Sequence, residues 1–159
     1  MMTDQVTLPA IAIKRIKEQS FSIREDLLTD PSKPIKIEIG QSLGYAVEAG
    51  LVNLTLRIYY HFAGESDPIL VDISVQNVFE IPNLQRFIID GAELKLPPVT
   101  ISNIVGLSIS HTRALLAKEL TGTVIQDNLP FIVNPEEVAS HFFPRMFSSE
   151  PTMSLSGAQ

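Results

Sequence analysis

Apolar residues occupy every second position over several stretches of the first half of the chain. This is the period of a β-strand with one buried face. The clearest stretch runs from Val52 to Phe62, where Asn53, Thr55 and Arg57 are among the residues that separate the apolar ones. We therefore expect residues 52–62 to form a strand with one face in the core.

Three further stretches have the same or a related pattern. Ile35 to Ile39 alternates in the same way, and residues 40–50 contain three glycines, so we expect a turn or bulge there. Most odd-numbered positions from Ile69 to Ile81 are apolar, after a polar turn at residues 63–68. Residues 11–23 are rich in β-branched residues with a less regular period, which predicts a bulged or bent first strand. The three strands within residues 35–81 are expected to form an antiparallel meander.

The period changes to that of a helix in the second half of the chain. Thr100 or Ser102 can cap a long helix that ends before Gly122, because glycine supplies the left-handed residue that stops a helix. Residues 134–137, Asn-Pro-Glu-Glu, combine a cap, a proline at the first helical position and an acid that can close a capping box. They predict a second helix that ends at about Phe143.

Strands first and helices last predict an α+β fold, a four-stranded antiparallel sheet with a long helix and a short C-terminal helix on one face. We expect one domain over residues 1–147 and a mobile C-terminal tail over residues 148–159. The long helix carries apolar residues outside its main stripe, including Leu107 and Ile109. One sheet covers only one face of a helix, so the chain is expected to form a homo-oligomer.

Composition and motifs exclude several classes of function. Among 159 residues, 12 Lys+Arg against 18 Asp+Glu give a net charge of −6, which disfavours nucleic acid as a partner. There is no cysteine, the three histidines have no metal-ligand spacing, and no nucleotide-binding glycine motif occurs. Residues 106–110 only approach a nucleophile elbow, and they lie inside a predicted helix. We therefore expect no enzyme activity, no metal and no cofactor.

The chain is also expected to be a soluble, cytoplasmic protein. Its apolar stretches are interrupted well before the roughly 20 residues that a membrane helix needs, which argues against membrane insertion. The N-terminal residues lack the basic region and uninterrupted apolar core of an export signal.

Residues 123–133, Thr-Val-Ile-Gln-Asp-Asn-Leu-Pro-Phe-Ile-Val, are unusually apolar for a connection between helices. Such a segment either packs on its own core or borders a groove for apolar segments of another chain. The second interpretation predicts a client-binding groove between this connection and the end of the strand at residues 69–81. Its candidate residues are Phe79, Ile81, Val124, Leu129, Phe131 and Val133.

Several strings occur together in an order that resembles the SecB family of bacterial protein-export chaperones, over roughly residues 11–147. The most specific part is the ending, in which Gly-Thr is followed by an apolar loop and a short helix. The strings are ILVDISVQNVFEI at residues 69–81, Arg-Ala-Leu-Leu at 113–116, Gly-Thr-Val at 122–124, Asn-Leu-Pro at 128–130 and Val-Asn-Pro at 133–135.

The resemblance implies a dimer of dimers with the long helices sandwiched between sheets. It also implies ATP-independent binding of unfolded polypeptides or preproteins, which are handed to the SecA motor of the translocase. Leu70 and Asp72 match an apolar and an acidic position that contact the motor on the sheet face. On the first strand, Gln19 and Ser22 partly replace the acidic residues of the family.

Other interpretations remain open at this point. A SecB-like chaperone dedicated to one client, such as an antitoxin, would keep the groove without the acidic docking surface. A structural or regulatory oligomer would keep the fold without a client. A small hydrolase would assemble its site from residues far apart in the sequence.

Overall fold

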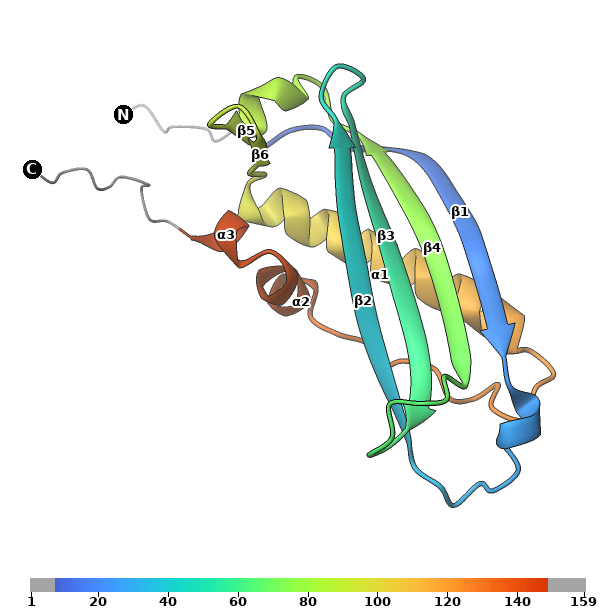
Figure 1. Cartoon of the computed structure of the whole chain (residues 1–159). Helices are drawn as coiled ribbons and strands as arrows, with labels where there is room; N and C mark the ends of the chain where they lie inside the picture. The colour runs from blue at the N-terminus through green and yellow to red at the C-terminus, as the bar shows by residue number, and fades with distance from the viewer. Residues whose placement is uncertain (1–7, 149–159) are drawn as a thin grey trace, which may run out of the picture.

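The computed structural model describes residues 8–148 and shows an antiparallel sheet with a long helix along one face (Figure 1). The sheet has four strands in the order β1-β4-β3-β2, and the helix is α1. The predicted fold class, α+β with a long helix and a short C-terminal helix, is confirmed. The predicted tail, apart from Ser148, lies outside the described residues. The main elements are β1 Ala12–Ile23, β2 Ile35–Ala46, β3 Leu51–Phe62, β4 Val71–Glu80, α1 Pro98–Leu120, α2 Pro135–Phe142 and α3 Pro144–Phe147.

Short elements connect the main ones. A 3₁₀ turn, η1 Glu25–Leu27, follows β1, and a second one, η2 Leu84–Phe87, follows β4. A two-stranded ribbon of β5 Ile88–Ile89 and β6 Glu93–Leu94 then leads into α1.

Three of the strands form the predicted meander, because β2 pairs with β3 and β3 with β4. β1 pairs with the other side of β4 and so becomes an edge strand. Its register shifts between Ile13 and Arg15 and between Glu18 and Ser20, which confirms the expected bulges.

The turn or bulge expected at residues 40–50 is wrong in its first part. β2 continues through Gly40 and Gly44 to Ala46, and only residues 47–50 form a turn. Gly50 closes this turn at φ +67°. A Cβ added at this position would lie 3.1 Å from the Ile81 carbonyl oxygen, so both the backbone angle and the space favour glycine. Gly40 and Gly44 need no such conformation, and the pairing of β2 with β3 runs through both without a register shift.

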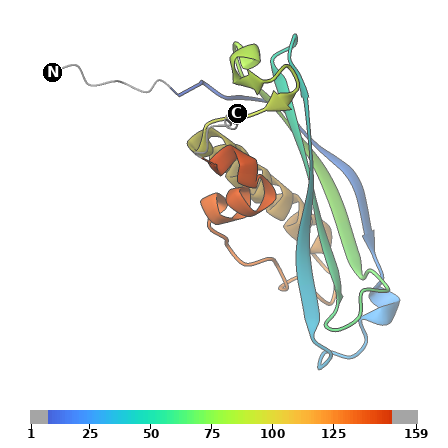
Figure 2. The same cartoon turned by 60° about the vertical axis from the view of Figure 1, so that its left-hand side comes forward.

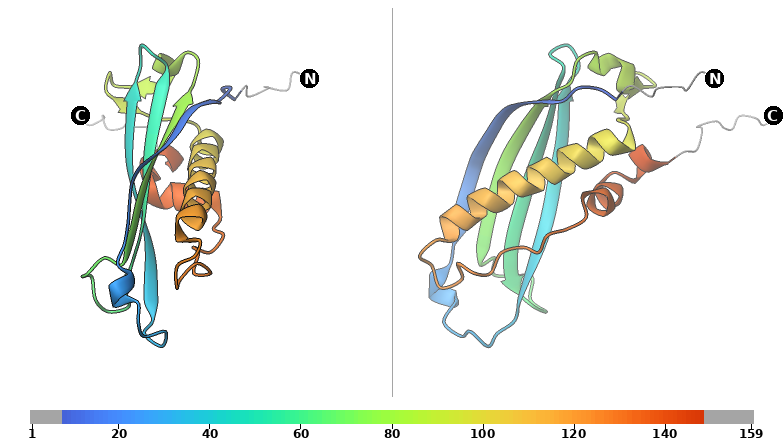
Figure 3. Two further views of the ribbon diagram at one scale, coloured as in Figure 1. Left: turned by 90° about the vertical axis from the view of Figure 1, so that its right-hand side faces the viewer. Right: turned by 180° about the vertical axis from the view of Figure 1, so that it is seen from behind.

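The core lies between the sheet and α1, with α2 and α3 beside α1 on the same side (Figure 2). Even-numbered residues of β3 and odd-numbered residues of β4 are buried against α1, as the alternation predicts. No helix covers the opposite face of the sheet in the described part of the chain (Figure 3). We call that opposite face the outer face.

The helix boundaries differ slightly from the expectation. α1 begins at Pro98, so neither Thr100 nor Ser102 caps it. Asn134 does cap α2, and its Oδ1 accepts a hydrogen bond from the Glu136 N–H at 2.9 Å. Glu137 makes no side-chain contact back to the cap within the described residues. α3, which was not predicted, adds one turn after Pro144.

Candidate functional site

The segment between α1 and α2 carries the most exposed apolar side chains of the described chain. Phe131 is 88% exposed and Ile132 is 86% exposed. The segment runs back alongside α1 towards α2 (Figure 3, right). Between segment and helix lies a cavity of about 420 Å³, which we call the apolar groove. Its lining consists of Gly106, Ile109, Ser110, Arg113, Ala114 and Ala117 of α1 with Leu129, Phe131, Ile132, Val133 and Pro135.

Two side chains from regular elements hold the segment in place. The Tyr60 hydroxyl of β3 donates to the carbonyl oxygen of Asn128, and Arg113 Nε of α1 donates to that of Pro130 at 2.8 Å. Leu129 lies between these two anchors and packs against the core. Burial raises the pKa of Tyr60 to about 12, so its hydroxyl keeps its proton at neutral pH.

Small residues on α1 form the floor of the groove. Gly106, Ser110, Ala114 and Ala117 recur at helical spacing, so they lie along one side of the helix. A Cβ at position 106 would lie 3.1 Å from the ring of Pro135, so glycine allows α2 to begin close to α1. The groove therefore has mainly small side chains on its α1 side and large apolar ones on the opposite side, which residues 129–133 form.

The structure brings together three of the six predicted groove residues. Leu129, Phe131 and Val133 line the groove, and the two alternatives for residues 123–133 both hold in part, because Leu129 packs inward while Phe131 stands in solvent. Val124 is 69% exposed but does not line the groove.

The assignment of Phe79 and Ile81 to the groove is wrong. Both side chains are fully buried in the core. Phe79 is on the inward face of β4, because the odd-numbered residues of this strand point towards α1. The Ile81 N–H donates to the carbonyl oxygen of Gly50 and so fixes Ile81 at the end of the sheet. Neither residue can touch a client without local unfolding.

Sequence reasoning missed two groove residues that matter here, Ile132 and Arg113. Ile132 is next to Phe131 in an irregular segment, where no alternation indicates that both side chains face solvent. Arg113 contacts Pro130 across 17 positions of sequence, and no local pattern signals such a contact.

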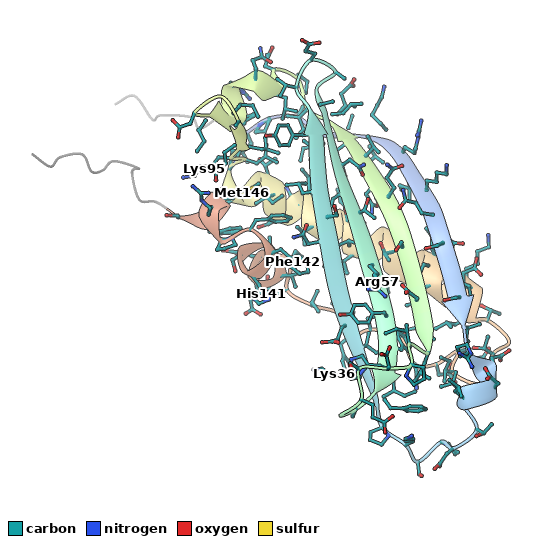
Figure 4. All side chains as sticks on the ribbon, viewed as in Figure 1. Lys36, Arg57, Lys95, His141, Phe142 and Met146 are labelled. Carbon is teal, nitrogen blue, oxygen red and sulfur yellow. The ribbon has the colours of Figure 1, made fainter. Side chains whose placement is uncertain are left out.

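The two residues matched to motor docking do not lie together on the outer face. Leu70 directly precedes β4 and is fully buried, so its expected exposure is wrong. Asp72 does lie on the outer face, but its carboxylate is paired with Arg57, with Nε–Oδ1 at 2.9 Å and Nη2–Oδ2 at 2.7 Å. Arg57 is labelled on that face in Figure 4. The negative charge of Asp72 is therefore compensated by Arg57 of the same chain.

A second hollow of about 900 Å³ lies along another flank of α1. Leu8, Pro9 and Ile11 form one side of it, and Val99 and Leu107 belong to its α1 side. Val99 is 52% exposed and Leu107 39% exposed. The helix thus shows apolar surface to solvent beyond the stripe that packs on the sheet, as the sequence predicted for Leu107. The placement of Ile109 outside the stripe is wrong, because Ile109 is only 6% exposed and belongs to the core.

Within residues 8–148, no three or more His, Cys, Asp or Glu side chains are grouped so that they could hold a metal ion. None of the helices described is long and apolar enough to span a membrane.

No protein-family model matches the chain, and no curated protein gives a significant match. Among solved structures, one similar chain is the SecB-like chaperone Rv1957 of Mycobacterium tuberculosis, in complex with a ChAD peptide from the HigA1 antitoxin, with a TM-score of 0.35 and 9% identity. That match covers 45% of this chain and 54% of the other, so it spans about half the length of Rv1957. A protein of unknown function from Streptococcus agalactiae also has a TM-score of 0.35 and 9% identity, over 80% of this chain and 98% of the other.

Proposed function

We propose that this protein is an ATP-independent chaperone that binds unfolded segments of other polypeptides in the apolar groove. The observation that carries the proposal is the exposure of Phe131 and Ile132. They lie on a segment that hydrogen bonds from β3 and α1 hold in place. Adjacent large apolar side chains at this exposure are costly in an isolated protein and mark a surface that another molecule covers.

The energetics suit reversible binding. Burying one Phe or Ile side chain contributes about 1.5–3 kcal/mol, so two such residues give only a weak contact for one groove. Several grooves in one oligomer would sum such contacts along a single unfolded chain. Binding of this kind needs neither nucleotide hydrolysis nor covalent chemistry.

The test is the aggregation of a chemically unfolded protein, followed by light scattering without nucleotide. The wild-type chain should slow aggregation, and the double variant Phe131→Ser/Ile132→Ser should protect clearly less. Val124→Ser is the matched control, because Val124 is an exposed apolar residue of the same connection that does not line the groove. Equal loss in the control, or none in the double variant, would contradict the proposal.

Delivery to the Sec translocase is the finer form of this proposal, and it derives from the resemblance to the SecB family. Its two docking residues give it little support, because Leu70 is buried and Asp72 is paired with Arg57. These observations favour a chaperone dedicated to one client. Purification of the protein with its bound polypeptides would then yield one recurrent sequence, whereas an export chaperone would yield many.

We also propose that the chain assembles as a dimer or a dimer of dimers through the solvent-facing side of α1. From Pro98 to Thr112 this helix has no acidic or basic side chain except the half-buried His111, and Val99 and Leu107 are exposed. Light scattering should give a multiple of 17.6 kDa for the wild type, and Leu107→Arg should shift the equilibrium towards the monomer. A structural or regulatory oligomer would assemble in the same way but fail to protect the unfolded protein.

A further inference from the structure

We propose that the apolar groove selects an extended segment of a partner protein that carries an acidic side chain, which pairs with Arg113. This inference rests on the proposed function and specifies which polypeptides the groove prefers. Arg113 is the single charged residue in the lining of the groove. The chemistry of its guanidinium therefore dominates the electrostatics of the site.

Arg113 has unused hydrogen-bonding capacity. Nε is engaged by the carbonyl oxygen of Pro130, but no carboxylate of residues 8–148 forms an ion pair with the two terminal nitrogens. The side chain is half-buried, with Ala114, Ala117 and Leu129 among the groove lining around it. A cation among apolar groups lacks part of its hydration, so a carboxylate from a ligand gains more there than in open solvent.

The contact with Pro130 also prepares the guanidinium for a ligand. Because the group is planar, the bond from Nε fixes the plane in which the terminal nitrogens lie. A carboxylate can accept two parallel hydrogen bonds from such a fixed fork. A lysine at this position would supply the charge without this geometry.

The backbone of residues 131–133, which lines the groove opposite α1, favours an extended ligand. The N–H groups of Phe131, Ile132 and Val133 donate no hydrogen bond to any described residue. An extended segment can pair with such groups as an added strand does. A helix cannot, because its own backbone groups are already bonded to each other.

These requirements disfavour a second copy of this chain as the occupant. Its α1 is a helix, and on its edge strand β1 the cations Lys14, Arg15 and Lys17 outnumber the one acid, Glu18, so this strand would repel Arg113. The acid of its other edge strand, β2, is Glu38, which is already bonded to His61 and paired with Lys36. A segment of another protein with alternating apolar residues and one Asp or Glu meets both the backbone and the charge requirement.

The experiment uses two fluorescent peptides with the same apolar, alternating sequence, which differ in one central residue, Asp or Asn. Fluorescence anisotropy gives their affinities for the full-length wild type and for Arg113→Gln. The wild type should bind the Asp peptide about tenfold more tightly, as expected for a hydrogen-bonded charge pair. Arg113→Gln should remove this preference, so that the Asp and Asn peptides bind it about equally. Because this variant also loses the bond to the Pro130 carbonyl oxygen, both affinities should fall below that of the wild type for the Asn peptide, and the ratio of the two affinities is the readout.

Two further variants separate charge from loop structure. Arg113→Lys should keep part of the preference, because it retains the charge but loses the fork. Tyr60→Phe loosens the same wall at Asn128 without changing its charge, so it should weaken both peptides and leave their ratio unchanged. The preference should also shrink as salt is raised.

The outcomes are distinguishable. Equal binding of both peptides to the wild type, or a preference that persists in Arg113→Gln, overturns the selection of an acidic segment but leaves the chaperone proposal intact. If neither peptide binds, while Phe131→Ser converts an oligomer into monomers in light scattering, the groove is occupied by a second copy. That result overturns both proposals.

Discussion

His111 on α1 donates from Nδ1 to the Oδ1 of Asn77 on β4 at 2.9 Å, and this contact joins the long helix to the sheet. Asn77 is fully buried, and its Nδ2 donates to the carbonyl oxygens of Leu54 and Val75 at 3.3 Å each. All polar atoms of this side chain are therefore satisfied within the core. The contact fixes which turn of α1 faces which part of β4.

Asn77→Ala is expected to lower the free energy of unfolding by about 1–3 kcal/mol, because the His111 N–H loses its partner in a partly buried setting. Urea denaturation measures this change. Ser74→Ala is the control, since Ser74 is on the same strand but on its outer face. Equal effects of the two substitutions would show that the contact between helix and sheet contributes nothing to stability.

The pair of His61 and Glu38 is expected to make stability depend on pH. His61 Nδ1 lies 2.9 Å from the Phe62 carbonyl oxygen and Nε2 lies 2.6 Å from Glu38 Oε2, so both ring nitrogens face acceptors. The Phe62 carbonyl and then Glu38 raise the pKa of His61 above 6.5, and His61 holds the pKa of Glu38 below 4.5.

The two shifts act at opposite ends of the pH range. The contribution of His61 is complete below pH 6.5 and is lost as the pH rises through its raised pKa. That of Glu38 is complete above pH 4.5 and is lost as the pH falls through its lowered pKa. The thermal midpoint of the wild type should therefore exceed that of Glu38→Gln most between pH 4.5 and 6.5. A difference in thermal midpoint that is the same at about pH 5.5 and at about pH 9 would contradict this pairing.

Leu70 and Asp72 should differ strongly in how much stability a substitution costs, although they are only two residues apart. Leu70→Ala removes a fully buried side chain and should cost about 2–5 kcal/mol of unfolding free energy. Asp72→Asn breaks an ion pair whose partners are 28% and 44% exposed, and it should cost about 0–1 kcal/mol, less at high salt. Chemical denaturation at two salt concentrations checks both values. A neutral Leu70→Ala would restore this residue as a candidate for partner contact.

Gly106 offers a test of the contact between α1 and α2. Gly106→Ala gains about 1 kcal/mol of helix propensity but brings its Cβ to 3.1 Å from the Pro135 ring, so it should be close to neutral. Gly106→Leu cannot be accommodated without moving α2, and it should lower the thermal midpoint. If both substitutions stabilise the protein, the close approach of α2 is not maintained in solution.

The elements with a regular period were predictable from the sequence, and the exceptions have physical causes. β3 and β4 alternate because each has one buried face, and α1 carries a helical stripe against the sheet. Gly40 and Gly44 were misinterpreted as a turn because a glycine in extended backbone looks the same in sequence as one with positive φ.

The site was less predictable than the fold. The apolar connection identified Leu129, Phe131 and Val133, because apolar residues in a loop are unusual wherever they point. Phe79 was misplaced because the alternation on β4 shows that its face is apolar but does not show that this chain's own core, rather than a bound segment, covers that end of the strand. Arg113 was missed because its role depends on how residues far apart in the chain meet.

The two bonds that tie residues 128 and 130 to the scaffold have a consequence for release. A wall anchored to β3 and α1 cannot fold over a bound segment as a lid does. The lifetime of a complex is then set by the contacts of the bound chain alone. If the groove binds clients as proposed, a client that begins to fold would withdraw its apolar residues from the groove, and its own folding would supply the driving force for departure.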